Sequence, residues 1–397
     1  MKLFLVVLLL FAFNCVFAQN SYQQDLDFLY QAAKKLPAYH DQVRGKEKAA
    51  YDKLYTQLRS REVGKSVVDT FTVLSSLLWL FKDKHLAFWM PLRNESDAIS
   101  IMPFVAEDPD SLKNVLKHSP RDSVEGIYHA GKQMLVGIYR TTTKDSLNCV
   151  VLESQTKAFS PGQLLGTLFQ RGGDSFRMIL VDPQSRSLLY SPGVRVTHGR
   201  FHVCDLRKEV EPSHSEFWPG EPYRFRKIGP NTAYLYLGTF YSSDENLKRA
   251  SAFAESIKDS LISDHLIVDI RGNMGGGDKC SRQFYDLIKK YSRRGKVYVL
   301  INSWVYSNAE QFAVRLKALK NVTLYGEKTD GTITYGNNSG RTLLLPSGRF
   351  KFYPTDMKDR GGFLKYEEVG VEPDVFLHSR SDWLEQVQAM IMGQKNR

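Results

Sequence analysis

The chain has 397 residues and a formal net charge of +11, which comes from 54 basic and 43 acidic side chains. This length exceeds what a single hydrophobic core usually supports, so we expect more than one domain. The basic residues are spread along the sequence instead of forming a run, and this pattern favours a solvated basic surface over a nucleic-acid-binding protein.

Residues 1–18 have the pattern of a secretory signal peptide. Lys2 precedes an apolar run from Leu3 to Phe13, and residues 16–18 (Val-Phe-Ala) provide a cleavage site. The run is too short to span a membrane. We therefore expect a secreted or periplasmic protein whose mature form begins at Gln19 and has no transmembrane segment.

Residues 19–92 are predicted to form an N-terminal helical domain, because apolar side chains recur at helical spacing. One such stripe contains Leu26, Leu29 and Ala33, and the more apolar stretch from Val67 to Phe81 indicates a buried helix. Residues 93–220 have a different pattern, in which short apolar runs alternate with turn residues. This pattern predicts a β-rich middle domain, whose role the sequence does not indicate.

Residues 221–397 contain alternating buried strands and amphipathic helices. Continuous apolar runs predict strands at residues 266–270, 297–301 and 322–325. Apolar residues at helical spacing predict helices after Cys280 and after Ser307. Strands and helices that alternate in this way indicate an α/β fold with a parallel sheet.

A glycine-rich loop and a serine follow two neighbouring strands of this core. Gly275 and Gly276 can adopt a positive φ and allow a ligand to approach the backbone closely. Ser307 begins the sequence Ser-Asn-Ala-Glu, which is a capping box with Glu310, and this capping role alone would explain the serine. The same helix N-terminus also suits a nucleophile, with the N–H groups of Gly275 or Gly276 and of Asn308 binding the oxyanion.

Four motifs in the second half of the sequence occur in the order found in a known family. The sequences RGNMGGG, SNAEQFA, GEKTDG and GVEPD resemble those of carboxyl-terminal processing (tail-specific) and tricorn-core serine peptidases, from about Tyr223 to Leu377. The resemblance implies a crotonase-like (ClpP/crotonase-type) catalytic core and a serine endopeptidase that hydrolyses peptides or unfolded proteins. It implies no metal and no organic cofactor, and it leaves the oligomeric state open.

The general base differs between the two branches of this family. In the processing branch it is a lysine in a Gly-Lys pair, but the corresponding residues here are Gly331 and Thr332, and Lys328 lies at a different position of the motif. The tricorn branch uses a histidine from an N-terminal segment, which matches His85 in KDKHLAF. The resemblance is therefore closer to the tricorn branch, and it implies that His85 is the general base.

The tricorn branch also has a serine directly before this histidine and a distant glutamate. Lys84 replaces the serine here, and Glu367 matches the glutamate, with Glu368 and Asp83 as alternatives for the residue that orients His85. These departures leave two other functions open. One is a catalytically degenerate module that binds peptide or lipid, and the other is an esterase that uses the same residues.

Two further features concern substrate binding. Many relatives contain a PDZ module with a Gly-Leu-Gly-Phe-type loop near the middle of the sequence, and this protein has no such loop. Residues 343–345 and 350–353 predict a β-hairpin whose edge could pair with an extended peptide as an added strand.

Overall fold

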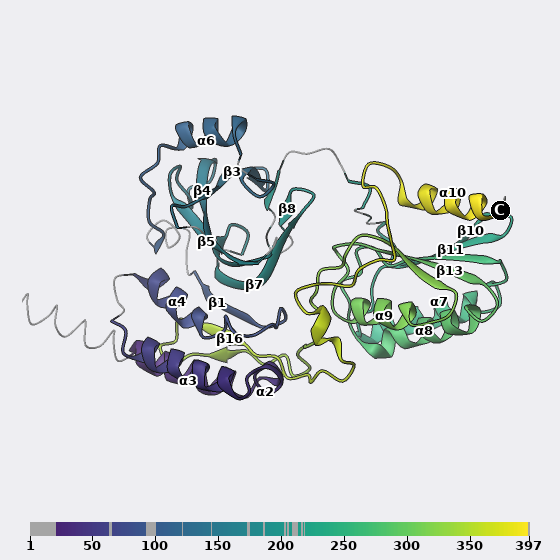
Figure 1. Cartoon of the computed structure of the whole chain (residues 1–397), viewed down its shortest axis with the longest axis horizontal. Helices are drawn as coiled ribbons and strands as arrows, with labels where there is room; N and C mark the ends of the chain where they lie inside the picture. The colour runs from purple at the N-terminus through teal and green to yellow at the C-terminus, as the bar shows by residue number, and fades with distance from the viewer. Residues whose placement is uncertain are drawn as a thin grey trace, which may run out of the picture. The chain divides into compact units, whose positions relative to one another are not determined.

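Figure 1 shows the computed structural model of the protein, which divides into two compact units. The first unit contains the residues up to 210 and residues 335–358, and the second contains residues 211–334 and 359–397. The expected signal peptide lies outside the described residues. The structure describes residues 21–62, 66–92, 101–120, 122–143, 145–172, 175–185, 187–201, 204, 206–208, 213–215, 217 and 219–395.

The first unit begins with the predicted amphipathic helices. Residues 21–33 are helical, and α2 (Pro37–Gln42), α3 (Lys46–Arg59) and α4 (Val67–Ser76) follow. The hydroxyl of Tyr22 donates a hydrogen bond to the carbonyl oxygen of Leu58, 2.6 Å away, and this bond ties the first helix to α3. Among the described residues, no helix is both long and apolar enough to cross a lipid bilayer.

The prediction of a helical segment up to residue 92 is wrong at its end. The helix α4 stops at Ser76, and Ala87–Pro91 form strand β1. This strand pairs antiparallel with β7 (Ser187–Thr197) on one side and with β16 (Lys351–Tyr353) on the other. Both partners are distant in sequence, so the strand depends on tertiary pairing that a local pattern cannot reveal.

Antiparallel strands in the first unit form a closed ring. They are β2 (Gly126–Ala130), β3 (Met134–Arg140), β4 (Ser146–Ser154), β5 (Leu164–Gly172), β6 (Ser175–Asp182), β7, β8 (Arg200–Phe201) and β9 (Leu206–Arg207). The spatial order is β7-β6-β5-β4-β3-β2-β9-β8, and β8 pairs again with β7. The helix α6 (Pro109–His118) packs Leu112 and Leu116 against Val150 and Leu152 of β4. The short strands predicted for this part of the protein are therefore confirmed.

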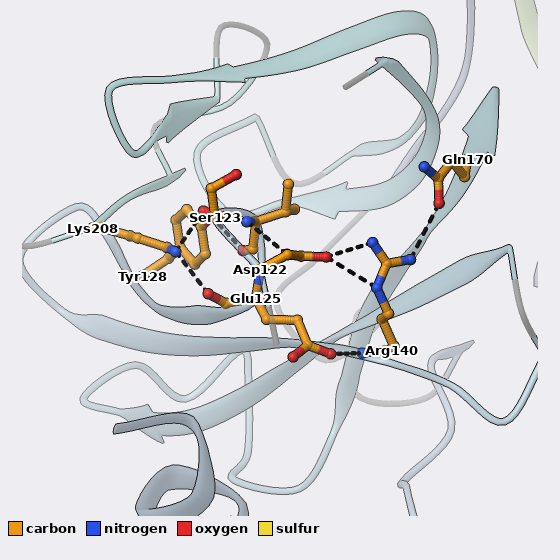
Figure 2. A network of polar contacts seen from close by, with 8 residues as sticks. Asp122, Ser123, Glu125, Tyr128, Arg140, Gln170 and Lys208 are labelled. Atoms are coloured by element: carbon orange, nitrogen blue, oxygen red, sulfur yellow. Dashed lines mark hydrogen bonds and ion pairs between the residues drawn. The ribbon is translucent and has the colours of Figure 1, made fainter. Parts of the chain in front are cut away.

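Figure 2 shows a polar network that joins several of these strands. Arg140, on β3, donates from Nε to Asp122 at 3.0 Å and from Nη1 to Gln170 of β5 at 3.2 Å. Lys208 donates from Nζ to the carbonyl oxygen of Glu125, 2.7 Å away, and burial lowers the pKa of this lysine. The network fixes the segment before β2 against β3, β5 and the residue after β9.

The hairpin predicted for residues 343–353 is present and belongs to the first unit. Strand β15 (Leu343–Leu344) pairs antiparallel with β16, which in turn pairs with β1. In the described part of the protein β15 has no second partner strand, so it forms one edge of the sheet.

A six-stranded sheet forms the centre of the second unit. In spatial order its strands are β10 (Tyr223–Gly229), β11 (Thr232–Leu237), β12 (His265–Asp269), β13 (Lys296–Ile301), β14 (Val322–Gly326) and β17 (Val375–Phe376). Five of these strands, β11, β12, β13, β14 and β17, pair in parallel with one another, and only the β10–β11 pairing of this sheet is antiparallel. The parallel sheet predicted from the apolar runs is confirmed.

Helices cover both faces of this sheet (Figure 1). The helices α7 (Asp244–Ile257), α8 (Asp278–Tyr291) and α9 (Asn308–Lys317) pack on one face, and α10 (Trp383–Lys395) packs on the other. Leu266 and Val268 of β12 belong to the core under the first three helices, whereas Ile267 packs with Trp383. The second unit is therefore a mixed α/β fold in three layers.

Candidate active site

Ser307 lies in a sharp turn between β13 and α9, with a φ of 53° and a ψ of −125°. Residues with a Cβ atom rarely adopt a positive φ, because the side chain then crowds the backbone. Among the described residues four non-glycine positions have a positive φ, and one of the others, Glu368, also belongs to this site. Unusual backbone angles of this kind concentrate at functional positions, and nucleophilic serines are found on strained strand-to-helix turns.

The carboxylate of Glu310 holds this turn in place. Its Oε1 accepts hydrogen bonds from the Thr329 hydroxyl at 2.5 Å and from the Gly331 N–H at 2.7 Å. Its Oε2 accepts from the N–H groups of Thr332 at 2.8 Å and of Ser307 at 3.2 Å. The sequence identified Glu310 only as part of a capping box. The structure shows that this buried carboxylate also binds the whole segment 329–332 beside the serine.

The position that corresponds to the lysine of the processing branch lies directly beside Ser307. The Ser307 N–H donates to the carbonyl oxygen of Thr332 at 2.7 Å, and the Thr332 hydroxyl donates to the carboxylate of Asp330. The residue at this position is therefore a threonine whose hydroxyl is bound to its own loop. Lys328 is part of a surface ion pair, with its Nζ 3.6 Å from the carboxylate of Glu372.

The glycine-rich loop contacts the same turn, as the sequence predicts for these two segments. Gly275 has a φ of 87°, and a Cβ atom there would lie 2.9 Å from the Cβ of Ser307 and 3.0 Å from the backbone nitrogen of Asn308. Gly276 has a φ of 138°, and a Cβ atom there would overlap the carbonyl group of Phe240. Only glycine fits at both positions without displacing the backbone.

The two glycines differ in the use of their N–H groups. The N–H of Gly275 donates to the side-chain oxygen of Asn273 at 2.9 Å. Within the described residues, the N–H groups of Gly276 and Asn308 have no protein acceptor. Because Asn308 is the first residue of α9, its N–H also lies at the positive end of the helix dipole. Gly276 and Asn308 are therefore the donors that remain available to an oxyanion.

Glu367 is buried and belongs to the same unit as Ser307. It follows the 3-10 helix η1 (Phe363–Tyr366), and its Oε2 accepts hydrogen bonds from the N–H groups of Ile333 at 3.0 Å and Thr334 at 2.8 Å. The N–H of the neighbouring Glu368 donates to the carbonyl oxygen of Gly331 at 2.7 Å. These two residues and Glu310 together hold residues 331–334, the segment that contacts Ser307.

His85 lies in the first unit, in the turn before β1. Asp83 is fully buried, and its Oδ1 accepts the backbone N–H of His85 at 3.1 Å while its Oδ2 accepts the Thr355 hydroxyl at 2.6 Å. The side chain of Gln42 forms two hydrogen bonds of 2.9 Å with the backbone of Lys82, one as donor and one as acceptor. The turn that carries His85 is therefore held at the backbone of Lys82 by Gln42 and at the backbone of His85 by Asp83. Ser307 and His85 belong to different units, so their pairing stays a prediction.

Residues 277–376 match the sequence profile of peptidase family S41. We call residues 277–376 the S41 segment. The S41 segment contains Ser307, Glu310 and Glu367, whereas His85 lies outside it. The match supports a serine-type peptidase, a hydrolase that acts on peptides. It does not distinguish the tricorn branch from the lysine-dependent branch. No curated protein is similar enough in sequence to count as a match.

Three solved structures are distantly similar to this protein. The photosystem II D1 C-terminal processing protease is 16% identical, the alignment covers 92% of this chain and 96% of that chain, and the TM-score is 0.39. Mature CPAF complexed with lactacystin is 11% identical, the alignment covers 94% of this chain and 98% of that chain, and the TM-score is 0.43. The tricorn protease is 13% identical, the alignment covers 96% of this chain and 37% of that chain, and the TM-score is 0.42. At these TM-scores the three likenesses carry no functional weight.

Proposed function

We propose that the protein is a secreted or periplasmic serine endopeptidase with a crotonase-like catalytic core in its second unit. The Oγ of Ser307 attacks the carbonyl carbon of the scissile peptide bond. The imidazole of His85 accepts the serine proton and then donates it to the leaving amine. The N–H groups of Gly276 and Asn308 bind the oxyanion of the tetrahedral intermediate, and Glu367 orients the base.

The observation that carries this proposal is the backbone conformation of Ser307. An N-cap residue normally has angles in the β region. The capping residues Ser66, Asp108 and Ser243 follow this rule, with φ values of −155°, −67° and −69°. The N-cap of α3 has almost the same angles as Ser307, with a φ of 54° and a ψ of −119°, and that residue is Gly45. A serine in a conformation suited to glycine indicates that the hydroxyl is required for something other than capping.

The surroundings of Ser307 supply the other requirement of acyl transfer, which is stabilisation of negative charge. The available N–H groups of Gly276 and Asn308 come from two segments that meet at the serine. Backbone donors fixed in advance need no reorganisation as charge develops, and losing one such donor typically lowers turnover by about 10²–10³-fold. The rigid turn held by Glu310 keeps the donor of Asn308 in place.

The assignment of His85 as the base is supported by what occupies the alternative positions. Thr332 stands where the processing branch has its lysine, and Lys328 is paired with Glu372 at the surface. A neutral imidazole is a competent base near neutral pH. The hydrogen bonds that Asp83 makes to the His85 backbone and to Thr355 give the histidine a fixed support.

A fluorophosphonate probe tests the proposal, because it reacts covalently with activated serines. We expect labelling of the wild-type protein at Ser307, no labelling of Ser307→Ala, and slower labelling of His85→Ala. Wild-type protein that has not been treated with the probe should cleave members of a peptide panel more efficiently than matched esters. This comparison separates a peptidase from an esterase. A folded wild-type protein that is neither labelled nor active on either panel would instead be the degenerate binding module.

A further inference from the structure

The first unit contains a pocket of about 630 Å³ that the catalytic proposal does not use. One wall consists of residues between Phe28 and His40, and the other consists of residues between Ser339 and Lys358, next to the β15–β16 hairpin. Pockets that bind small ligands or peptide side chains usually have volumes of about 300–1,000 Å³, so this one is large enough to take several residues of a peptide.

The lining of this pocket is rich in positive charge. Lys35, Arg341 and Lys358 line it with exposed side chains, and none of the three forms an ion pair with any residue that the structure describes. Asp356 is the one carboxylate among the lining residues. Three positive charges against one negative charge give the pocket an excess of two positive charges and favour an anionic occupant.

The carboxylate of Asp356 is already occupied by its own hairpin. Its Oδ1 accepts the N–H of Asn338 at 2.8 Å, and its Oδ2 accepts the N–H of Ser339 at 3.0 Å. Burial acts to raise the pKa of Asp356, but these N–H groups outweigh it and hold the pKa below its usual range. Asp356 therefore stays ionised and bound to the backbone, and it forms no ion pair with Lys35, Arg341 or Lys358.

The pocket also offers a sheet edge. Leu343 is a lining residue and belongs to the edge strand β15. The N–H of Leu345 donates to the carbonyl oxygen of Phe350 at 2.9 Å, in register with the pairing of Leu343 and Phe352. Hydrogen-bonded and non-bonded pairs alternate along an antiparallel ladder, so the N–H and C=O of Leu344 point to the unpaired side. An extended peptide can add there as a strand.

One lining residue connects the pocket to the turn that carries the proposed base. Thr355 lines the pocket, and its hydroxyl donates to Asp83, whose other oxygen accepts the His85 N–H. The pocket is thus two hydrogen bonds away from the His85 backbone. A peptide bound in the pocket lies next to a part of the proposed catalytic machinery.

We propose that this pocket and the edge of β15 bind an extended, carboxylate-bearing peptide segment, as an accessory binding site for the substrate. The lysines and the arginine pair with the carboxylates of the segment. The apolar side chains of Phe28, Leu36 and Leu343 contact an apolar residue of the segment. The outward N–H and C=O groups of Leu344 form hydrogen bonds with its backbone. The carboxylates come from acidic side chains or from a free C-terminus. That the bound segment is a substrate rests on the proposed function, but the binding itself does not require cleavage.

The test measures binding to the full-length Ser307→Ala protein, which cannot consume the ligand. The probe is the fluorescein-labelled peptide TETELETE, followed by fluorescence anisotropy. Two matched probes separate the sources of charge, since TQTQLQTQ lacks the acidic side chains and C-terminally amidated TETELETE lacks the terminal carboxylate. The binding variant combines Lys35→Gln, Arg341→Gln and Lys358→Gln. Its control removes the same charge elsewhere, through Lys117→Gln, Arg293→Gln and Lys320→Gln, three exposed positions outside the pocket.

We expect the pocket variant to bind TETELETE at least about tenfold more weakly than the control variant, with the difference shrinking at high salt because the contacts are ionic. Leu344→Pro should also weaken binding, because it removes the outward N–H from the edge. Weaker binding of TQTQLQTQ points to acidic side chains, and weaker binding of the amidated peptide points to a C-terminus. Equal affinity of the two triple variants, or equal affinity for all three peptides, overturns the proposal. If binding follows the expected pattern while the wild-type protein hydrolyses nothing, only the peptidase assignment fails.

Discussion

Replacing Ser307 with glycine is expected to make the protein more stable and inactive at the same time. The serine has a φ of 53° and a ψ of −125°, which strain any residue with a Cβ atom. Glycine removes that strain and also removes the nucleophile. A residue that served only as a helix cap would not show this opposition between stability and activity.

The size of the effect on stability can be worked out from three contributions. Relief of the backbone strain is worth about 1–3 kcal/mol. Glycine makes the unfolded protein more flexible, which costs about 0.4–1 kcal/mol, and losing a serine cap to glycine costs a few tenths more. The net stabilisation is about 1 kcal/mol, which corresponds to a rise in Tm of about 2–4 °C for a unit of this size. Turnover should fall by about 10⁴-fold or more.

The assay pairs thermal and denaturant unfolding with turnover on any peptide that the wild-type protein cleaves. Gly45→Ser is the matched control, because Gly45 has almost the same backbone angles and no atom lies within 4 Å of where its Cβ would be. That substitution should destabilise the first unit by about 1 kcal/mol and leave the chemistry unchanged. A Ser307→Gly protein that is less stable than wild type, or that still turns over, would refute the reasoning.

Three other substitutions test the remaining parts of the site. His85→Ala should lower turnover by about 10²–10⁴-fold, whereas Lys328→Ala should change it by less than about twofold; similar losses in both would show that the base is misassigned. Gly275→Ala should destabilise the protein by about 1–3 kcal/mol and impair turnover, because the new Cβ atom would collide with the turn that carries Ser307. Gly340→Ala is the milder control in unfolding experiments, because Gly340 also has a positive φ, of 64°, but its Cβ would have no close neighbour. Glu310→Gln should cost about 1–3 kcal/mol in denaturant unfolding, because its amide N–H₂ would face backbone donors, and an unchanged midpoint would mean that the turn does not depend on this carboxylate.

The sequence was sufficient to predict the parallel sheet and the meeting of the glycine loop with Ser307. Both inferences depend on local signals, which are continuous apolar runs and apolar residues at helical spacing. The loop after β12 and the turn after β13 follow neighbouring parallel strands. The carboxyl ends of parallel strands lie at one edge of the sheet, so residues that follow them are brought together by the topology alone.

Other features of the site could be found only in the tertiary structure. The sequence presents Glu310 as an ordinary capping residue, because its bonds to Thr329, Gly331 and Thr332 join segments that are distant in sequence. The sequence also cannot choose between Gly275 and Gly276 as donors. The choice follows from the hydrogen bond between the Gly275 N–H and Asn273, which depends on the conformation of the folded loop.

The same distinction explains the strand β1 and the placement of residues 335–358. Local periodicity specifies which residues of a segment face a core, because side-chain direction repeats with the backbone period. It does not specify which distant segment will complete the hydrogen bonds of an extended backbone. Residues 87–91 are a strand because β7 and β16 flank them, and residues 335–358 belong to the first unit because β16 pairs with β1. The sequence alone therefore predicted the strands and helices on either side of Ser307, while pairing between distant segments decided how the His85 turn and the accessory pocket are built.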